Sequence, residues 1–463
     1  MRTWTWAMAL ALLAGCTVGP DYVAPTPDLP PQWSASSTAT VDSRWWQQMG
    51  DPQLTSLVER AARANLDIRT ASNRLEQSRI ARQVSGSATL PGIAGNGDYQ
   101  RERRSEVGLN DPSGNAGQAP FEQWQGALDL SWEIDLWGHI RRRIEMADAQ
   151  VELSQAQRDA VILSISAQTA TDYLRLRGVQ QQLRVLAQNL HIAEQSRGLT
   201  QTRFDNGVTT DLDTANAAAL VATLQARAAP LQAQRDRLIN ALSYLLGLAP
   251  HALAEELGSA RALPQLAPEL ALGIPSQLAQ RRPDIQQSEA RLHQAIAAIG
   301  AAEADFYPRV TLGASAGFQA LEGGDIGAWN SRQWSYGPSL YLPIFQGGRL
   351  TGTLALRRQE QQAAALDYQK TVLGAWHEVD DAMTGYAAEQ RHHAALSEAV
   401  LHNQRALDTA RERYRQGAID FLNVLAVQRS LLDTQSALVD SAADLAIDRV
   451  QLYRALAGGW PQA

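Results

Sequence analysis

Residues 124–136 read WQGALDLSWEIDL, a stretch that alternates between apolar and polar side chains. Its even-numbered positions carry tryptophan, glycine, leucine and isoleucine, whereas its odd-numbered positions are mainly glutamine, aspartate, serine and glutamate. A period of two is that of a β-strand with one apolar and one polar face. We therefore expect a strand here, with Trp124 near one end and Trp132 near the other.

Three further stretches predict partner strands. Residues 310–318 alternate in the same way, residues 334–344 carry apolar side chains at Trp334, Tyr336, Leu340, Leu342 and Ile344, and residues 93–103 alternate weakly. Strands of this length, with an apolar outer face and aromatic ends, are typical of a transmembrane barrel. A soluble sandwich would need more than four strands.

Four strands are too few to close a barrel, because bacterial barrels begin at about eight strands. An open sheet edge in lipid would leave backbone groups unpaired. Several chains must therefore share one barrel, and a trimer would supply twelve strands.

Each predicted strand pair precedes a long helical region. No proline lies between Pro120 and Pro230 or between Pro343 and Pro461, and Gly207 and Gly417 mark similar places where a helix pair can reverse. The return arms carry apolar residues at heptad spacing, which indicates left-handed coiled-coil packing. These residues are Leu224, Leu231, Leu238 and Leu245, then Val424, Leu431, Leu438, Leu445 and Leu452. Periodicity alone leaves a cytoskeletal-style rod open.

The two halves of the chain resemble each other in order. Asp67-Ile68 and Asp284-Ile285 are separated by the same offset as Pro91 and Pro308, and RFDNG at 203–207 is echoed by RYRQG at 413–417. This order predicts an internal duplication. We expect a signal peptide at 1–15, a lipidated tether at 16–50, a first repeat at 51–258 and a second at 259–463. Each repeat would hold two strands and a long helical hairpin, with equatorial helices in the second.

The N-terminus predicts export and lipid attachment. Arg2 precedes an apolar stretch too short to span a bilayer, and this stretch ends in Leu13-Ala14-Gly15-Cys16, which resembles a bacterial lipobox. Cys16, the only cysteine, would carry acyl chains, and this covalent lipid is the only added group that we expect. Thr17 favours outer-membrane sorting, and the Pro- and Ser-rich residues 18–37 predict an extended tether. The alternative is an ordinary signal peptide with a stray cysteine.

Composition excludes several classes. The chain has 463 residues and a net charge of −7, which argues against a nucleic-acid binder. No apolar run reaches the 18 to 20 or so residues of a membrane-spanning helix. Gly313-Ala314-Ser315-Ala316-Gly317 has the letters of a hydrolase elbow, but it lies within a predicted strand, so we expect no enzyme. His377, Asp380 and Asp381 have helical ligand spacing but are more typical of a solvated helix face, so we assign no metal site.

Short phrases complete a family resemblance that covers residues 16–460. VGPDY at 18–22, Trp45-Trp46, GDPQL at 50–54 and RRPDI at 281–285 resemble the TolC-like outer membrane efflux channels, in particular their NodT-type lipoprotein branch. The resemblance implies an α+β membrane protein. It would be a homotrimer whose twelve-stranded outer-membrane β-barrel, four strands per chain, is continuous with a long periplasmic α-helical coiled-coil barrel.

The same resemblance implies a function without catalysis. The chain would be the exit duct of a tripartite efflux system, with a periplasmic adaptor protein and an inner-membrane pump of the RND type. It would be lipid-anchored in the outer membrane and would pass small toxic compounds or drugs. Two alternatives stay open: a type I-like duct for proteins or metal ions, and a non-channel periplasmic coiled-coil adaptor lipoprotein.

The resemblance also implies a periplasmic gate at the hairpin tips. Carried over by position, the gate tyrosine is Tyr414 and its carboxylate partner is Asp213, while the family's arginine falls at Ile419 and its pore aspartates at Asn423 and Ala426. An arginine of the lipoprotein branch is kept as Arg429. The residues assigned to the gate are Asp205, Gly207, Asp211, Asp213, Tyr414, Gly417, Asp420, Asn423, Ala426 and Arg429. The alternative is that they are ordinary turn and helix-cap residues.

Overall fold

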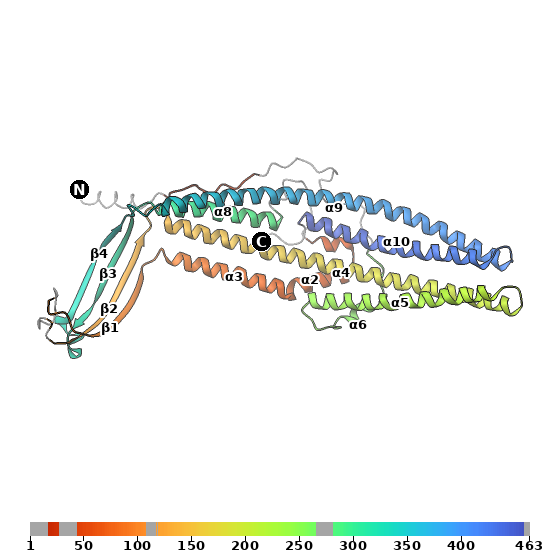
Figure 1. Ribbon diagram of the computed structural model, residues 1–463, viewed down its shortest axis with the longest axis horizontal. Helices are drawn as coiled ribbons and strands as arrows, with labels where there is room; N and C mark the ends of the chain where they lie inside the picture. The colour runs from red at the N-terminus through yellow and green to blue at the C-terminus, as the bar shows by residue number, and fades with distance from the viewer. Residues whose placement is uncertain (1–16, 27–43, 108–116, 118, 265–280, 458–463) are drawn as a thin grey trace. The chain divides into compact units, whose positions relative to one another are not determined.

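The computed structural model describes residues 17–26, 44–107, 117, 119–264 and 281–457 (Figure 1). Its elements, in chain order, are η1 (Trp45–Met49), α2 (Pro52–Ala64), α3 (Leu66–Ser87), β1 (Gly92–Glu102), β2 (Phe121–Ile134), α4 (His139–Asp205), α5 (Asp211–Leu245), α6 (Ala254–Leu257), α8 (Pro283–Ala304), β3 (Arg309–Ala320), η3 (Gly323–Asp325), η4 (Trp329–Ser331), β4 (Arg332–Tyr341), α9 (Arg349–Arg415) and α10 (Phe421–Ala455).

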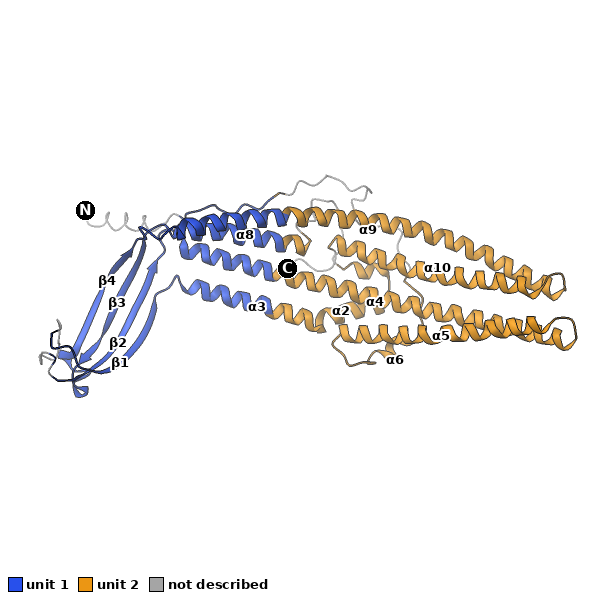
Figure 2. Cartoon of the chain, viewed as in Figure 1, with its two compact units in different colours: residues 1–25, 74–154, 287–368 blue, residues 26–73, 155–286, 369–463 orange. Residues whose placement is uncertain are grey.

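The chain forms two compact units, and each draws on both halves of the sequence. Unit 1 comprises residues 1–25, 74–154 and 287–368, and unit 2 comprises residues 26–73, 155–286 and 369–463 (Figure 2). The spatial division thus cuts across the two predicted repeats, whose boundaries stay predictions.

Unit 1 contains one antiparallel sheet with the order β1-β2-β3-β4. Strand β2 of the first half pairs with β3 of the second, and the register places apolar residues in rows: Leu130 faces Ala314, which faces Tyr336. Two residues further along β3, on the same face, Ala316 faces Trp334. Trp334 is 69% exposed and Tyr336 is 78% exposed, so the described chain leaves this apolar face uncovered. An apolar face of this extent marks a surface that meets lipid or another protein.

The other face of the sheet is polar. Asp129 faces Ser315, and Ser315 faces Ser335 on β4. The amide of Asn96 on β1 donates a hydrogen bond of 2.5 Å to Asp129. The alternation predicted for residues 124–136 is therefore confirmed as two faces of opposite character, as a water-filled barrel requires.

Two strands end earlier than the sequence predicts. Strand β2 ends at Ile134 instead of Leu136, because the Leu136 N–H turns back to donate to the Ile134 carbonyl oxygen at 2.9 Å. Strand β4 ends at Tyr341, so Leu342 and Ile344 are not strand residues. Tyr341 pairs with Arg309, the first residue of β3, and Pro343 has no N–H with which to extend the ladder.

Unit 2 contains the greater part of the helical hairpins, including both tips, and the helix lengths confirm the duplication. Helices α4 and α9 each have 67 residues, and α5 and α10 each have 35. The heptad residues Leu224 and Leu245 of α5 are buried, as are Val424, Leu431 and Leu452 of α10. None of the described helices combines the length and the apolar character needed to cross a membrane.

An apolar core in unit 2 includes the short helix η1, just before α2. Trp45 is fully buried and stacks on Tyr453 with ring centroids 5.7 Å apart, and the Tyr453 hydroxyl donates to Gln48 at 2.9 Å. The predicted tether at 16–50 is therefore corrected at its end, because η1 is part of the core. Tryptophan burial stabilises the unit through its large apolar area.

Candidate functional site at the hairpin tips

Each hairpin of unit 2 reverses at a glycine in the left-handed conformation. Gly207 has φ of +69° and Gly417 has φ of +76°. At the first tip the Gly207 N–H donates to Phe204 O at 2.8 Å and the Val208 N–H to Arg203 O at 2.8 Å. The second tip repeats both bonds, at 3.0 and 2.9 Å, which is the Schellman arrangement that ends a helix. The predicted turns at both glycines are confirmed.

The two tips contact each other through Arg203 of α4. One guanidinium nitrogen donates to the backbone carbonyl of Tyr414 at 3.0 Å, and the guanidinium lies 4.8 Å from the centre of the Tyr414 ring. Tyr414 is 4% exposed and its ring also packs on Phe421 at 5.5 Å. A cation is attracted both to the face of an aromatic ring and to the partial negative charge at a helix C-terminus, so both contacts stabilise this position of the guanidinium. Arg203 is not among the site residues predicted from the sequence.

The structure does not pair Tyr414 with Asp213, so this carried-over interaction is corrected. Within the described residues the Tyr414 hydroxyl is buried and has no hydrogen-bond partner. Asp213 instead accepts a hydrogen bond from the Thr209 hydroxyl on its own hairpin. A threonine four residues away meets Asp213 locally, whereas Tyr414 turns its ring toward Arg203 and Phe421.

The other acidic tip residues are local to their own turns. Asp205 ends α4 and accepts from Gln201 at 2.9 Å. Asp211 begins α5 and accepts from Thr214 at 3.1 Å. Asp420 precedes α10 and is exposed, with no side-chain cap hydrogen bond. Three of the four predicted tip aspartates therefore lie on the first hairpin.

Helix α10 exposes the two positions to which the resemblance carries the pore aspartates, Asn423 and Ala426, and also the kept arginine, Arg429. Their spacing of three places all three on one side of the helix. The opposite side, including Phe421 and Val424, is buried. Their role at a constriction stays a prediction.

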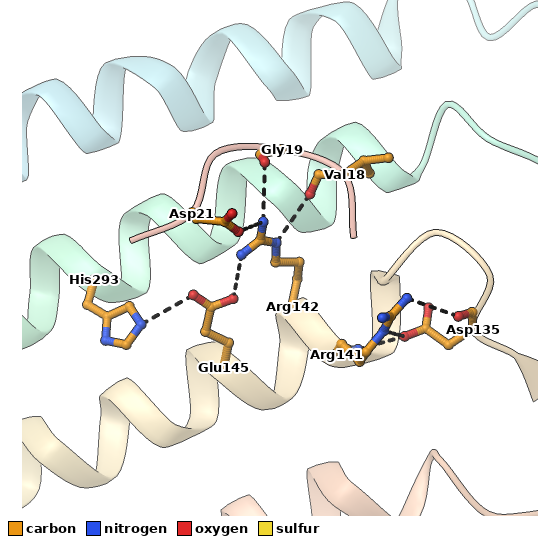
Figure 3. Close-up of polar contacts among 8 residues, drawn as sticks. All are labelled: Val18, Gly19, Asp21, Asp135, Arg141, Arg142, Glu145 and His293. Carbon is orange, nitrogen blue, oxygen red and sulfur yellow. Dashed lines mark hydrogen bonds and ion pairs between the residues drawn. The ribbon is translucent and has the colours of Figure 1, made fainter. Parts of the chain in front are cut away.

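The start of the predicted tether forms a separate site in unit 1, which Figure 3 shows. The Arg142 side chain is 3% exposed and donates to the carbonyls of Val18 and Gly19 at 3.2 Å each. It also pairs with Asp21 and Glu145 at 2.8 Å. The start of the predicted extended tether is thus docked on α4. Cys16, the predicted lipidation site, lies outside the described residues.

Tyr22 completes this docking on α8. Its ring stacks on His293 at 4.1 Å and its hydroxyl donates to Glu289 at 2.7 Å. Burial, followed by the bond to Glu289, raises the pKa of Tyr22 well above its usual range, so the hydroxyl remains a donor. The VGPDY phrase therefore encodes a docked segment.

Two further family phrases, GDPQL and RRPDI, are also structural. Asp51 caps α2 through the backbone N–H of Gln53 at 2.8 Å and accepts from the Tyr173 hydroxyl at 2.5 Å. Burial, helped by that bond, raises the pKa of Tyr173 to about 12. Arg282 is 8% exposed and donates to Asp284, Glu378 and the Ala455 carbonyl at 2.6 to 2.8 Å.

The letters of the hydrolase elbow lie inside β3, where Ser315 pairs with Asp129 and Ser335. A nucleophile elbow needs a strand-to-helix turn at its serine. This position is therefore part of the sheet ladder.

A sheet with an uncovered apolar face and long helical hairpins closed by glycine turns define an outer-membrane channel protein with a periplasmic helical extension. Residues 57–248 and 274–458 match the model of the family described as outer membrane efflux protein, and the chain belongs to this family. The resemblance noted in the sequence is confirmed. Members of this family are channels and not enzymes, and they form trimers in tripartite efflux pumps.

Full-length relatives support this membership. The chain is 31% identical to outer membrane protein OprJ of Pseudomonas aeruginosa, covering 98% of this chain and 96% of the relative. It is 30% identical to the antibiotic efflux pump outer membrane protein ArpC of Pseudomonas putida, covering 98% and 95%. The solved structure of the outer-membrane channel OprN is 34% identical and covers 96% of this chain and 100% of its own, with a TM-score of 0.89.

Proposed function

We propose that this chain is the exit duct of a tripartite efflux pump that removes small toxic compounds or drugs. Three copies would form one twelve-stranded barrel, and the helical hairpins would extend into the periplasm. A periplasmic adaptor would meet the hairpin tips, and an inner-membrane pump of the RND type would supply the energy. Acyl chains on Cys16 would anchor the duct in outer-membrane lipid.

The observation that carries this proposal is the sheet of unit 1. Strands β1 and β4 each have a neighbour on one side only within the described chain, while the apolar face between them is exposed. Unpaired backbone groups are costly in lipid, and further copies of the chain supply the missing neighbours. The polar row at Asp129 and Ser315 would then line water.

The name of the relative ArpC supports drugs as cargo. The test is accumulation of fluorescent drug-like dyes in a deletion strain, with and without the restored gene. We expect higher accumulation in the deletion strain and full reversal on restoration. Unchanged accumulation, together with new sensitivity to a metal salt or loss of a secreted polypeptide, would instead support the alternative export duct.

A further inference from the structure

The sheet of unit 1 has a periplasmic end and an outer end. Helix α4 follows β2, α9 follows β4 and α8 precedes β3, so all three helices join the same end of the sheet (Figure 2). The β3–β4 loop, residues 321–331, lies at the opposite end. Strand β3 has 12 residues, enough to cross the hydrocarbon of a bilayer. Because the helices extend into the periplasm, the β3–β4 loop lies at the outer leaflet of the outer membrane.

Arg332 continues the apolar row of β4 at this outer end. It stands two residues before Trp334, and alternate residues of a strand share a face, so Arg332 lies on the apolar face of the sheet. Its partner on β3 is Phe318, which is 37% exposed. An arginine on the lipid face is costly at the bilayer midplane but costs little near the headgroups. As the first residue of β4, Arg332 lies where the apolar row ends and the headgroups begin.

The β3–β4 loop holds the Arg332 guanidinium on an exposed aromatic ring. The guanidinium carbon is 3.6 Å from the centre of the Trp329 ring, and one guanidinium nitrogen donates to the Trp329 carbonyl. Trp329 is 79% exposed. The loop is held by its own hydrogen bonds, since the Ser331 hydroxyl lies 2.8 Å from the carbonyl oxygens of Asp325 and Ala328. A cation that is already positioned loses less freedom when it binds a ligand.

The Arg332 guanidinium keeps hydrogen-bond donors for a ligand. A guanidinium carries several N–H donors in a planar fork, and in the described part of the chain one nitrogen bonds to Trp329 and no carboxylate forms an ion pair with Arg332. By contrast, Arg309 at the periplasmic end of β3 pairs with Asp305. The remaining donors of Arg332 suit an anion from outside the chain, and their planar fork matches a phosphate group.

The surface beside Arg332 is apolar. Toward the middle of the sheet the same face continues through Trp334 and Tyr336, which are 69% and 78% exposed. Across the sheet, the Tyr99 ring packs on Trp124 with centroids 4.4 Å apart. A ligand that suits both the cation and this surface combines an anionic head with apolar chains. A lipid with a phosphorylated headgroup has this chemistry, whereas free phosphate would leave the aromatic surface unused.

We propose that Trp329 and Arg332 form a binding site for the phosphate of an outer-leaflet lipid whose acyl chains lie along Trp334 and Tyr336. The guanidinium donates to the phosphate oxygens, and the Trp329 ring holds its plane in position. The lipid is a phosphorylated glycolipid of the lipid A type. This inference goes beyond the proposed function, because it depends on the outer end of the sheet and not on any cargo.

The test is the binding of diphosphorylated lipid A to the purified full-length trimer in detergent, measured by native mass spectrometry. The same lipid without its phosphates is the matched probe. For the unchanged protein we expect the phosphorylated lipid to bind about tenfold more tightly, the effect of a charge-assisted hydrogen bond. Equal binding of the two lipids would refute the site, because the apolar face alone would then hold them. Displacement of the lipid by inorganic phosphate would also refute it, since the site would then serve a free anion.

Three variants locate the effect: Arg332→Gln, Arg332→Lys and the matched control Arg405→Gln, at an exposed position of α9. Arg332→Gln should lose most of the preference for the phosphorylated lipid. Arg332→Lys should keep part of it, because an ammonium group keeps the charge but not the planar fork. Arg405→Gln should match the unchanged protein.

Heat-modifiable trimers on gels should be the same for all variants, so that weaker binding reports the site and not assembly. A full preference in Arg332→Gln would contradict the proposal. An equal loss in Arg405→Gln would do the same, because net charge would then explain the binding. The comparison of the two lipids on the unchanged protein needs no variant, so it decides the question even if Arg332→Gln fails to assemble.

Discussion

Arg142 holds the N-terminal segment by bonds to two backbone carbonyls and two carboxylates, and its side chain is 3% exposed. Replacing it with glutamine would leave Glu145 and the carbonyls of Val18 and Gly19 without their shared donor. Loss of one member of a buried charged set costs about 3 kcal/mol. We therefore expect the segment to open about 100-fold more often, since each 1.4 kcal/mol or so is tenfold.

Amide exchange at Val18 measures this opening, because its N–H donates to the Trp137 carbonyl at 3.2 Å. The matched control is the neighbouring Arg141, which Figure 3 shows paired with Asp135. Its side chain is 41% exposed, so Arg141→Gln should change the opening free energy by less than about 0.5 kcal/mol. Unchanged exchange in Arg142→Gln would contradict the role of this side chain.

The sequence could not predict this docking, and the reason is physical. Residues 18–37 are rich in proline and serine, which indicates only that regular structure is absent. Whether such a segment docks depends on a buried cation more than 100 positions away, and no local pattern reports that. Arg203 was missed for the same reason. It occupies the same position in the first hairpin as Arg413 does in the second, and only the packing distinguishes the two side chains.

At the scale of elements, the tip glycines test the turn geometry. Gly207 has φ of +69°, a conformation in which a side chain costs about 1 kcal/mol, so Gly207→Ala should lower stability by that amount. Gly198 lies in the interior of α4 with open space around it, so Gly198→Ala should raise stability by up to about 1 kcal/mol. Thermal melting of the two purified variants should shift in opposite directions. A shift in the same direction would contradict the assigned turn.

Helix α10 carries carboxylates that are partly desolvated at its surface, and this makes stability depend on pH. Burial, and then Glu389, raise the pKa of Asp444, while Arg175 and His392 lower it more weakly. The folded chain therefore binds this proton more readily than the unfolded chain, and the cost of the ionised form is complete only above the raised pKa. Asp444→Asn should stabilise the protein at pH 7 by about 0.5 kcal/mol, since the site is partly solvated.

This gain should shrink as the pH falls through the raised pKa toward about 4, the ordinary range of an aspartate. Melting of both proteins at pH 7.5 and pH 4 measures the change. Asp408→Asn, at another exposed position, on α9, is the control and should show no comparable gain. A gain for Asp444→Asn that is the same at both pH values would contradict this account.

Elements with a strong local period were predictable. The alternation at residues 124–136 anticipated β2, and Gly207 and Gly417 anticipated both tips, because each feature depends on neighbouring residues alone. The ends of the strands were not predictable from local sequence, because they depend on the partner strand. Strand β4, for example, ends at the residue that pairs with the first residue of β3. The pairing of Tyr414 with Asp213 also failed, because it depended on how two hairpins pack.

At the scale of the whole molecule, lipid anchoring and trimer assembly are separable. The acyl chains that we expect on Cys16 would hold the chain at the membrane, whereas assembly depends on the sheet of unit 1. At Gly317 an added Cβ would lie 2.1 Å from the Gly126 carbonyl oxygen, so Gly317→Ala would force β3 away from β2. At Gly313, on the same strand, the nearest atom is 4.0 Å away.

We therefore expect Cys16→Ser to lose bound lipid and to leave the membrane more easily on washing, while keeping heat-modifiable trimers. Gly317→Ala should show the reverse: it should keep its lipid but lose trimers, because the β2–β3 pair joins the two repeats of each chain into one sheet. Gly313→Ala should behave like the unchanged protein in both assays. Labelling with a radioactive fatty acid and unheated gels measure the two properties in one preparation. If Cys16→Ser yields only monomers, the lipid is itself required for assembly, and the open-edged sheet of one chain does not suffice to recruit the others.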